Sequence, residues 1–307
     1  MKILLLNQFY PPDVAATGQL LADLAEGLVE GGHEVHVLCS RRVYGGGAER
    51  YPAEQLINGV YIHRVAATGF GRRNIVGRLI DYLSFYVLAA WKALLLPPMS
   101  ICVVLTTPPF IALCGVMLFL LKGTRLVLWT MDLYPEIAVA YGVFKKGGLL
   151  HRNLARISRW IYRQASQIIS LGEIMTERLV EAGAKAEKIT TVHNWVPGEV
   201  VRPVSPGNSV LRREWNSNGR VTLMYSGNIG LGHELDTVIH AVKKLREGVS
   251  LKVLFVGNGK MREPLDKLTT ELGLNCIEFH PPVPLDKLSD VLAVGDIHLV
   301  SQKPGTQ

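Results

Sequence analysis

The sequence predicts an α/β protein of two domains, each built on a parallel β-sheet with helices on both faces. Short apolar runs alternate with helical patterns from residue 3 to residue 301, which is the order of elements in a doubly wound sheet. A segment rich in proline, glycine, serine and asparagine interrupts the alternation over residues 196–219. We therefore expect a first domain over 1–197, a linker over 198–219 and a second domain over 220–307.

The first domain is expected to hold seven strands, most of them runs of β-branched and aliphatic residues that suit buried positions. They are residues 3–6, 34–39, 60–65, 101–106, 126–129, 167–171 and 189–193. Helical patterns cover 18–30, 78–96, 110–122, 149–165 and 174–182. Two Pro-Pro pairs divide the longest uncharged run, 93–121, so we expect a buried strand and a buried helix there rather than a transmembrane span.

The second domain is expected to hold four strands, over 221–226, 251–256, 276–279 and 297–301. Helices are expected between them, over 234–246, 261–272 and 285–293. A doubly wound nucleotide-binding sheet usually has five or six strands. We therefore expect the second domain to be incomplete and the chain to be truncated after it.

The positive charge of the chain is concentrated in its first half. Residues 55–172 hold thirteen Lys or Arg and three acids, an excess of ten, whereas the whole chain has a net charge of +7. An anionic membrane surface and nucleic acid are the partners that such a region attracts. No recognition helix or RNA-binding motif accompanies the charge, so nucleic acid is not expected. The four cysteines form no CxxC pair, which argues against a zinc site and suits a reducing cytosol.

Four arginines spaced 4, 3 and 4 residues apart form one stripe on the helix predicted over 149–165. They are Arg152, Arg156, Arg159 and Arg163. A basic amphipathic helix suits an anionic membrane surface, and neighbouring basic segments carry the aromatic residues Phe70, Phe85, Tyr86 and Trp91. The alternative is a helix face that is simply solvated.

Two glycine-containing turns follow the first two strands of the second domain. Glycines let backbone amides approach an anion, and a helix N-terminus adds its positive dipole. Ligands of such sheets bind at the carboxyl edge, near the switch between strands one and four. The alternative is that the glycines only permit tight packing. The candidate residues of this anion-binding edge are Ser226, Gly227, Asn228, Gly257, Asn258 and Lys260.

Candidate residues of the first domain also follow predicted strands. Asp132 and Glu136 come directly after the strand 126–129, where two carboxylates suit hydrogen bonding to sugar hydroxyls or general acid–base work. The alternative for Asp132 is a cap on the following helix. Gly18 opens the first helix, and it either borders a ligand or only forms the turn. Asn194 follows the last strand, where it either lines a cleft or shapes the exit turn.

The motifs together resemble glycosyltransferase family 4, in particular its bacterial cell-surface polysaccharide branch, which makes exopolysaccharide, O-antigen or capsule. The resemblance covers nearly the whole chain. The residues that carry it are NQFYPP at 7–12 with Gly18, GGHEV at 31–35, DLYPE at 132–136, HNWVP at 193–197, YSGNIG at 225–230 and GNG at 257–259.

This resemblance implies a GT-B fold of two Rossmann-like domains, with the nucleotide sugar on the second domain and the acceptor on the first. The six candidate residues of the anion-binding edge would then form the donor site. It implies metal-independent transfer of a hexosyl or N-acetylhexosaminyl group, without a cofactor and with retention at the anomeric carbon. The acceptor would be a polyprenyl-diphosphate-linked sugar or another glycan. The enzyme would be peripheral on the cytoplasmic face of the cell membrane.

The sequence departs from the family at three places. Met131 stands where many members have His, and Asn228 and His233 stand where many have Arg and Lys. The family's motif of two Glu separated by seven residues does not follow Ser301, so we expect this chain to be inactive. The rival interpretations are a nucleotide-sugar 2-epimerase of the same fold and a non-catalytic fragment that binds membrane or a partner.

Overall fold

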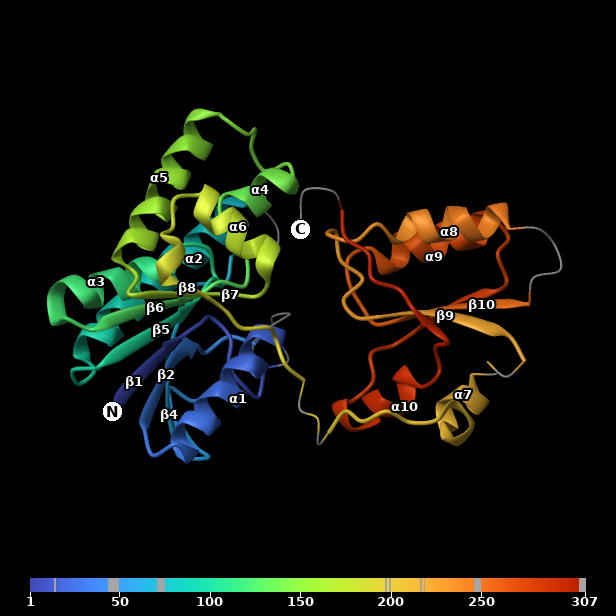
Figure 1. Ribbon diagram of the computed structural model, residues 1–307, viewed down its shortest axis with the longest axis horizontal. Helices are drawn as coiled ribbons and strands as arrows, with labels where there is room; N and C mark the ends of the chain where they lie inside the picture. Colours follow the sequence, from blue (N-terminus) through green and yellow to red (C-terminus); the bar gives the residue numbers. More distant parts are fainter. Residues whose placement is uncertain are drawn as a thin grey trace. The chain divides into compact units, whose positions relative to one another are not determined.

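The computed structural model describes residues 1–13, 15–43, 50–70, 75–196, 200–215, 219–245 and 250–303, together with residues 198 and 217. The chain divides into two compact units, Met1–Trp195 and Val196–Gln307, which are described separately (Figure 1). Each unit is a β-sheet with helices on both faces, as the sequence predicts.

The sheet of the first unit has eight described strands in the order β3-β4-β2-β1-β5-β6-β7-β8. All neighbours are parallel except β3, which runs antiparallel to β4 at the edge. The seven predicted strands are present and β3 is additional. The bounds are β1 Lys2–Leu6, β2 Glu34–Ser40, β3 Glu54–Ile57, β4 Val60–Val65, β5 Ile101–Leu105, β6 Arg125–Trp129, β7 Gln167–Ser170 and β8 Ile189–Thr191.

Alternate residues of the central strand β1 pack on opposite faces of this sheet, because strand side chains have a period of two. Leu4 and Leu6 contact a core shared with Phe85 and Ile161, whereas Ile3 and Leu5 contact a core shared with Leu21. Figure 1 shows α1 on one side of the sheet and α2, α3 and α5 on the other. The helices are α1 Ala16–Glu30, α2 Ile75–Leu95, α3 Ala112–Lys122, α4 Glu136–Ala140, α5 Leu149–Gln164 and α6 Glu173–Glu181.

The sheet of the second unit has four described strands in the order β11-β10-β9-β12, all parallel. Helices α8 and α9 cover one face, and the short helices α7 and α10 cover the other (Figure 1). The strands are β9 Val221–Ser226, β10 Leu251–Val256, β11 Ile277–His280 and β12 Ile297–His298. The helices are α7 Val210–Glu214, α8 Leu235–Lys244, α9 Arg262–Glu271 and α10 Leu288–Leu292.

Much of the segment expected as a linker, 198–219, is instead part of the second unit. Ser209 caps α7 by accepting from the backbone N–H of Arg212 (2.9 Å), and the backbone N–H of Val210 donates to Asp290 (3.0 Å). The buried guanidinium of Arg212 contacts Asp296 at 2.8 Å and the carbonyl of Val294 at 2.8 Å. A five-residue helix is too short to produce a periodic pattern, so the sequence does not reveal it.

The uncharged run 93–121 divides between the end of α2, strand β5 and most of α3. Among the described residues, no helix has both the length and the apolar character needed to cross a membrane.

Candidate functional site

The loops that follow β9 and β10 lie against each other at the carboxyl edge of the second sheet. The backbone N–H of Ile229 donates to Asn258 O (2.9 Å), and the backbone N–H of Met261 donates to Ile229 O (3.0 Å). A β-carbon on Gly257 would lie 1.9 Å from Gly227 O, and one on Gly259 would lie 2.2 Å from Ile229 O. Glycine is therefore required at 257 and 259 for the two loops to meet. Tight packing, the alternative role that we expect for these glycines from the sequence, therefore explains why glycine stands at 257 and 259.

Gly227 differs from these two glycines because the space beside it is open. A β-carbon there would meet the Tyr225 hydroxyl oxygen only at 3.5 Å, which is ordinary contact. Its backbone has φ +156, in the region that favours glycine. The neighbouring Ser226 and Asn228 are exposed, as are Asn258 and Lys260 on the second loop. The structure thus brings the six predicted donor-site residues together, with an accessible surface around Gly227.

The end of β12 borders the same loops. Because β9 pairs with β12, the first and fourth strands of this sheet are adjacent. The backbone N–H of Glu234 donates to Ser301 Oγ (3.0 Å), and His233 Nδ1 lies 2.6 Å from Ser301 O. This is the carboxyl-edge switch point at which doubly wound sheets bind ligands.

Two cations follow the β10 turn, and they differ in what they contact. Arg262 donates to Gly257 O (2.6 Å) and to His280 O (3.0 Å), so its guanidinium ties the ends of β10 and β11 together. Lys260 is exposed and stands two residues before α9 begins at Arg262. Of the two, Lys260 is the cation that remains accessible to an anion.

Asp132 lies just beyond the carboxyl end of β6 in the first unit. The backbone N–H groups of Met131 and Asp132 both donate to Thr106 Oγ1, at 3.1 and 3.0 Å. Burial raises the pKa of the Asp132 carboxyl above its ordinary value. Within the described residues no hydrogen bond reaches this carboxyl group, which borders a small cavity of about 30 Å³ with Tyr134 and Tyr162.

The alternative role of Asp132 as a helix cap is not found. Helix α4 begins at Glu136 after Pro135, without a side-chain cap. Glu136 does not line the cavity beside Asp132, and its buried Oε2 atom has no hydrogen-bond partner among the described residues. The structure therefore does not bring the two predicted carboxylates into one cavity.

Gly18 and Asn194 follow strands of the same sheet at its carboxyl edge. Gly18 is buried, and a β-carbon there would lie 3.1 Å from the Phe9 carbonyl carbon, so glycine lets α1 approach the loop after β1. Asn194 is exposed. Its neighbour Trp195 stacks on Trp129 with a centroid separation of 5.5 Å and donates from Nε1 to Asp23 (3.0 Å).

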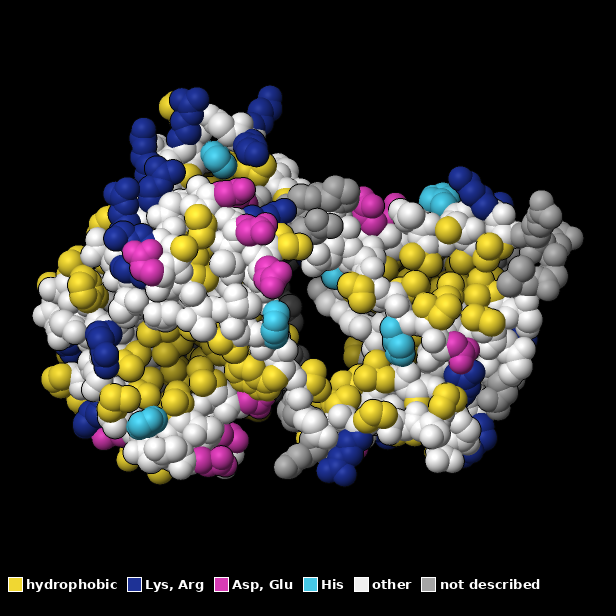
Figure 2. All heavy atoms as spheres, viewed as in Figure 1, with side chains coloured by type: hydrophobic (Ala, Val, Ile, Leu, Met, Phe, Trp, Pro, Cys, Tyr) yellow, Lys and Arg dark blue, Asp and Glu magenta, His cyan; other side chains and the backbone are white. Residues whose placement is uncertain are grey.

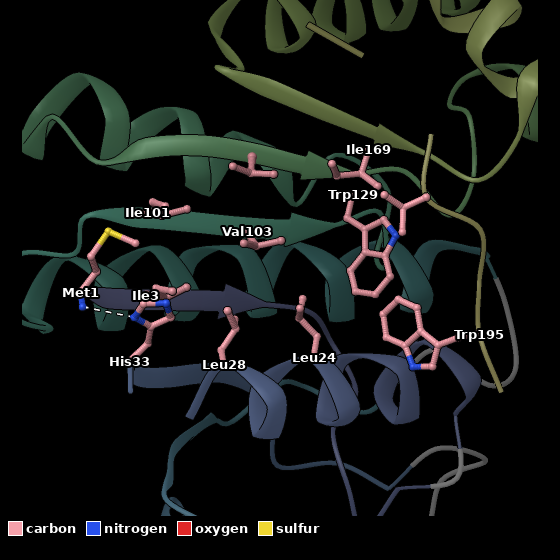
Figure 3. A pocket seen from close by; sticks show the side chains of 12 residues that line it. Met1, Ile3, Leu24, Leu28, His33, Ile101, Val103, Trp129, Ile169 and Trp195 are labelled. Carbon is pink, nitrogen blue, oxygen red and sulfur yellow. Dashed lines mark hydrogen bonds between the residues drawn. The ribbon is translucent and has the colours of Figure 1, made fainter. Parts of the chain in front are cut away.

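A larger pocket of about 350 Å³ lies on the α1 side of the first sheet (Figure 3). It extends from Met1 and His33 at the amino end of the sheet to Trp129 and Trp195 at the carboxyl end. Its lining is almost wholly apolar and contains none of the predicted site residues. Strand residues such as Val103, which point to the α1 side of the sheet, form its floor. The sequence does not predict this pocket, because apolar strands look the same whether or not a helix covers that face of the sheet.

The four predicted arginines of α5 are all exposed, and the opposite side of the helix buries Ser158, Ile161 and Tyr162. Figure 2 shows a row of Lys and Arg side chains along this helix. Of the aromatic residues expected to accompany them at the surface, Phe70 and Trp91 are exposed, whereas Phe85 is fully buried in the core. Among the described residues, no group of three His, Cys, Asp or Glu side chains could hold a metal ion.

The fold is of the GT-B type, with two Rossmann-like domains. Residues 16–195 match the glycosyl transferase 4-like domain, and the chain belongs to this family.

Two curated glycosyltransferases are similar in sequence to this chain. The chain is 28% identical to the putative colanic acid biosynthesis glycosyl transferase WcaI of Escherichia coli K12, over 99% of this chain and 77% of WcaI. It is 24% identical to the probable glycosyltransferase WbjE of Pseudomonas aeruginosa, over 65% of this chain and 50% of WbjE.

Solved structures share the fold at low sequence identity. Anabaena HepE in complex with UDP has a TM-score of 0.68 at 16% identity, covering 97% of this chain and 73% of HepE. WaaG, a glycosyltransferase involved in lipopolysaccharide biosynthesis, has a TM-score of 0.67 at 16% identity, covering 98% of this chain and 75% of WaaG. Sucrose-phosphate synthase of Thermosynechococcus elongatus has a TM-score of 0.76 at 13% identity, covering 97% and 74%.

Proposed function

We propose that the function of this protein is to transfer a sugar from a nucleotide-diphosphate sugar to a lipid-linked or glycan acceptor in cell-surface polysaccharide synthesis, with retention at the anomeric carbon. The observation that carries the proposal is the open, glycine-lined edge beside Gly227, in a chain of this family. The similarity to WcaI, a putative colanic acid biosynthesis glycosyl transferase, supports the polysaccharide role, and the similarity to HepE, solved in complex with UDP, supports the nucleotide donor.

The donor diphosphate would lie over the β9 loop. Gly227 leaves room for its oxygens, Asn228 and Asn258 offer amide donors, and Lys260 supplies a positive charge. The N-terminus of α8 follows the same loop and adds its dipole. Gly257 acts indirectly in this arrangement, because its missing side chain lets the second loop support the first.

The acceptor would lie at the carboxyl edge of the first sheet, where Asp132, Gly18 and Asn194 are found. A partly buried carboxyl group without a protein partner suits a hydrogen bond to a sugar hydroxyl, because that bond replaces lost water. We assign Asp132 to orienting the reacting hydroxyl. The hydroxyl oxygen would bond to the anomeric carbon on the same face from which the diphosphate leaves, and the leaving diphosphate would accept the hydroxyl proton. Retention then requires no protein nucleophile.

The arginine stripe of α5 would attract the first unit to an anionic membrane surface, where a polyprenyl-diphosphate-linked acceptor is available. Each basic residue near such a surface contributes about 1 kcal/mol, and salt weakens the attraction. The four exposed guanidinium groups support this assignment.

Calorimetry with nucleoside diphosphates and their sugars tests the donor site. Gly227→Val should abolish binding because the new side chain occupies the space of the diphosphate. Gly273→Val is the matched control, since Gly273 also has a positive φ and open space around it but lies after α9. Equal affinities of the two variants would contradict the assignment. Formation of an epimerised nucleotide sugar without any acceptor would favour the epimerase interpretation instead.

A further inference from the structure

Helix α2 presents an apolar face to the outside of the first unit. Six large apolar side chains on this helix are each 60–65% exposed: Val76, Leu79, Leu83, Val87, Trp91 and Leu95. Ile80 and Leu88 are exposed as well. Most of these positions recur every three or four residues, so they form one broad face of the helix.

The opposite side of α2 already provides the contacts that the fold requires. Phe85, Ala89 and Ala93 are buried in the core against the sheet. Two charged side chains described on this helix are engaged at its flanks: Asp81 accepts from Thr68 Oγ1 (2.8 Å), and Lys92 pairs with Glu54 (2.5 Å). The outward apolar face is therefore additional to the core, and solvent exposure of so many large apolar side chains is unusual for a monomer.

Neighbouring helices of the same layer carry further exposed apolar side chains and the arginines. Helix α3 packs beside both α2 and α5 (Figure 1). Lys122, at the end of α3, donates to the carbonyls of Leu94 (2.6 Å) and Leu96 (2.8 Å), which brings the C-terminal ends of α2 and α3 together. The exposed Leu120 and Leu121 of α3 precede this lysine. Beyond α3, α5 contributes the arginine stripe and the exposed Trp160.

We propose that the outward face of α2 inserts into the interfacial layer of an anionic phospholipid bilayer and anchors the first unit there. The role that this anchoring would have, which is to bring the first unit to a lipid-linked acceptor, rests on the proposed function. Membrane binding itself requires neither donor nor acceptor. Here α2 is the main anchor, and the α5 arginines only add attraction to anionic headgroups.

Two observations favour a lipid surface over a protein partner. The exposed apolar face lies in the layer that also carries the arginines, within a region holding an excess of ten positive charges, which complements anionic headgroups. Apolar side chains with tryptophan on one side and basic residues nearby are the composition of helices that lie in the membrane plane. The 21 residues of α2 extend about 30 Å, enough to lie along the interface over several lipids.

Vesicle flotation separates the two contributions. The full chain is mixed with phosphatidylcholine vesicles, with or without phosphatidylglycerol. The triple variant Leu83→Gln, Val87→Gln and Trp91→Gln should bind both kinds of vesicle about tenfold more weakly or worse, because it removes apolar contact without changing the charge. The variant with Gln at all four α5 arginines should lose only the increment due to phosphatidylglycerol, together with its salt dependence. The control variant has Gln in place of Ile174, Val180 and Leu285, which are also exposed but lie outside α2. It should bind both kinds of vesicle like the parent.

A second measurement does not depend on the stability of the triple variant. Lipids brominated on the acyl chain should quench the tryptophan fluorescence of the parent, and Trp91→Phe should lose most of that quenching. Flotation of the triple variant equal to that of the parent would overturn the proposal, as would quenching unaffected by Trp91→Phe. A parent that is a dimer without lipid and becomes a monomer in the triple variant would also overturn it, because a second copy would then cover the face. Calorimetry with nucleotides is unaffected by any of these results, so it tests the donor site separately.

Discussion

Gly257 packs directly against the backbone of Gly227: a β-carbon on Gly257 would lie 1.9 Å from Gly227 O. The same loops are joined by a backbone hydrogen bond from Gly227 N to Val256 O (2.9 Å). The two glycines therefore have different roles, although both stand at the ends of neighbouring strands. Gly257 permits the contact, and Gly227 presents the open surface.

This difference predicts the effects of alanine at the two positions. Gly257→Ala should destabilise the second unit by about 3 kcal/mol, because the methyl group meets a carbonyl oxygen that belongs to the backbone. Gly227→Ala should cost about 1 kcal/mol, from its positive φ alone. Urea denaturation, with hydrogen exchange in β10 as the readout of unfolding, measures both free-energy costs. Equal costs would show that the loops do not meet as described.

Most of the strands could be predicted from the sequence because they are short runs of aliphatic and β-branched residues that alternate with longer helical patterns. Ile3 to Leu6 are buried on both faces, and such a run suits a central strand of a parallel sheet. Strand β3 could not be predicted, because Glu54–Ile57 is short and mostly exposed at a sheet edge. Helices α4 and α7 have five residues each, too few for a helical period.

The candidate sites were harder to predict because their roles depend on contacts between distant segments. The sequence places Gly227 and Gly257 in equivalent turns, and only the distance between the two loops separates packing from openness. Similarly, the spacing of Asp132 and Glu136 suggests a pair, but only Asp132 borders the cavity. The exposed face of α2 is apolar like its buried face, so periodicity does not distinguish them.

The burial of Asp132 predicts a pH-dependent effect of its removal. Its pKa is raised in the folded chain, so the folded state binds this proton more strongly than the unfolded state does. The stabilising contribution is complete below the ordinary carboxyl pKa, about 4, and is lost as the pH rises through the raised value. Asp132→Asn should therefore gain stability relative to the parent as the pH increases toward neutrality.

Thermal unfolding of both proteins at several pH values measures this gain. Glu177→Gln serves as the control, because Glu177 is exposed on α6 of the same unit. Unfolding temperatures of Asp132→Asn that stay parallel to those of the parent at every pH would show that the carboxyl is not desolvated.

The assignment of 200–215 to the second unit predicts a large effect at Asp296. Its Oδ1 atom contacts Arg212 (2.8 Å), and its Oδ2 atom accepts from the backbone N–H of Thr222 (2.8 Å). Asp296→Ala leaves a largely buried guanidinium without its carboxylate and should cost about 3 kcal/mol. Glu263→Ala breaks an exposed pair with Lys267 and should cost about 0.5 kcal/mol or less. Similar small losses for both in denaturation would mean that the segment is not anchored as described.

Hydrogen exchange with and without a bound nucleotide tests the central claim most directly, because it locates the donor within the chain. Uridine, guanosine and adenosine diphosphates are tried in turn, and exchange is mapped with the one that binds. We predict slower exchange in peptides covering 226–232 and 257–261, with α1 unchanged. A bound nucleotide that protects only peptides of Met1–Trp195, or that leaves both loops unaffected, would contradict the account.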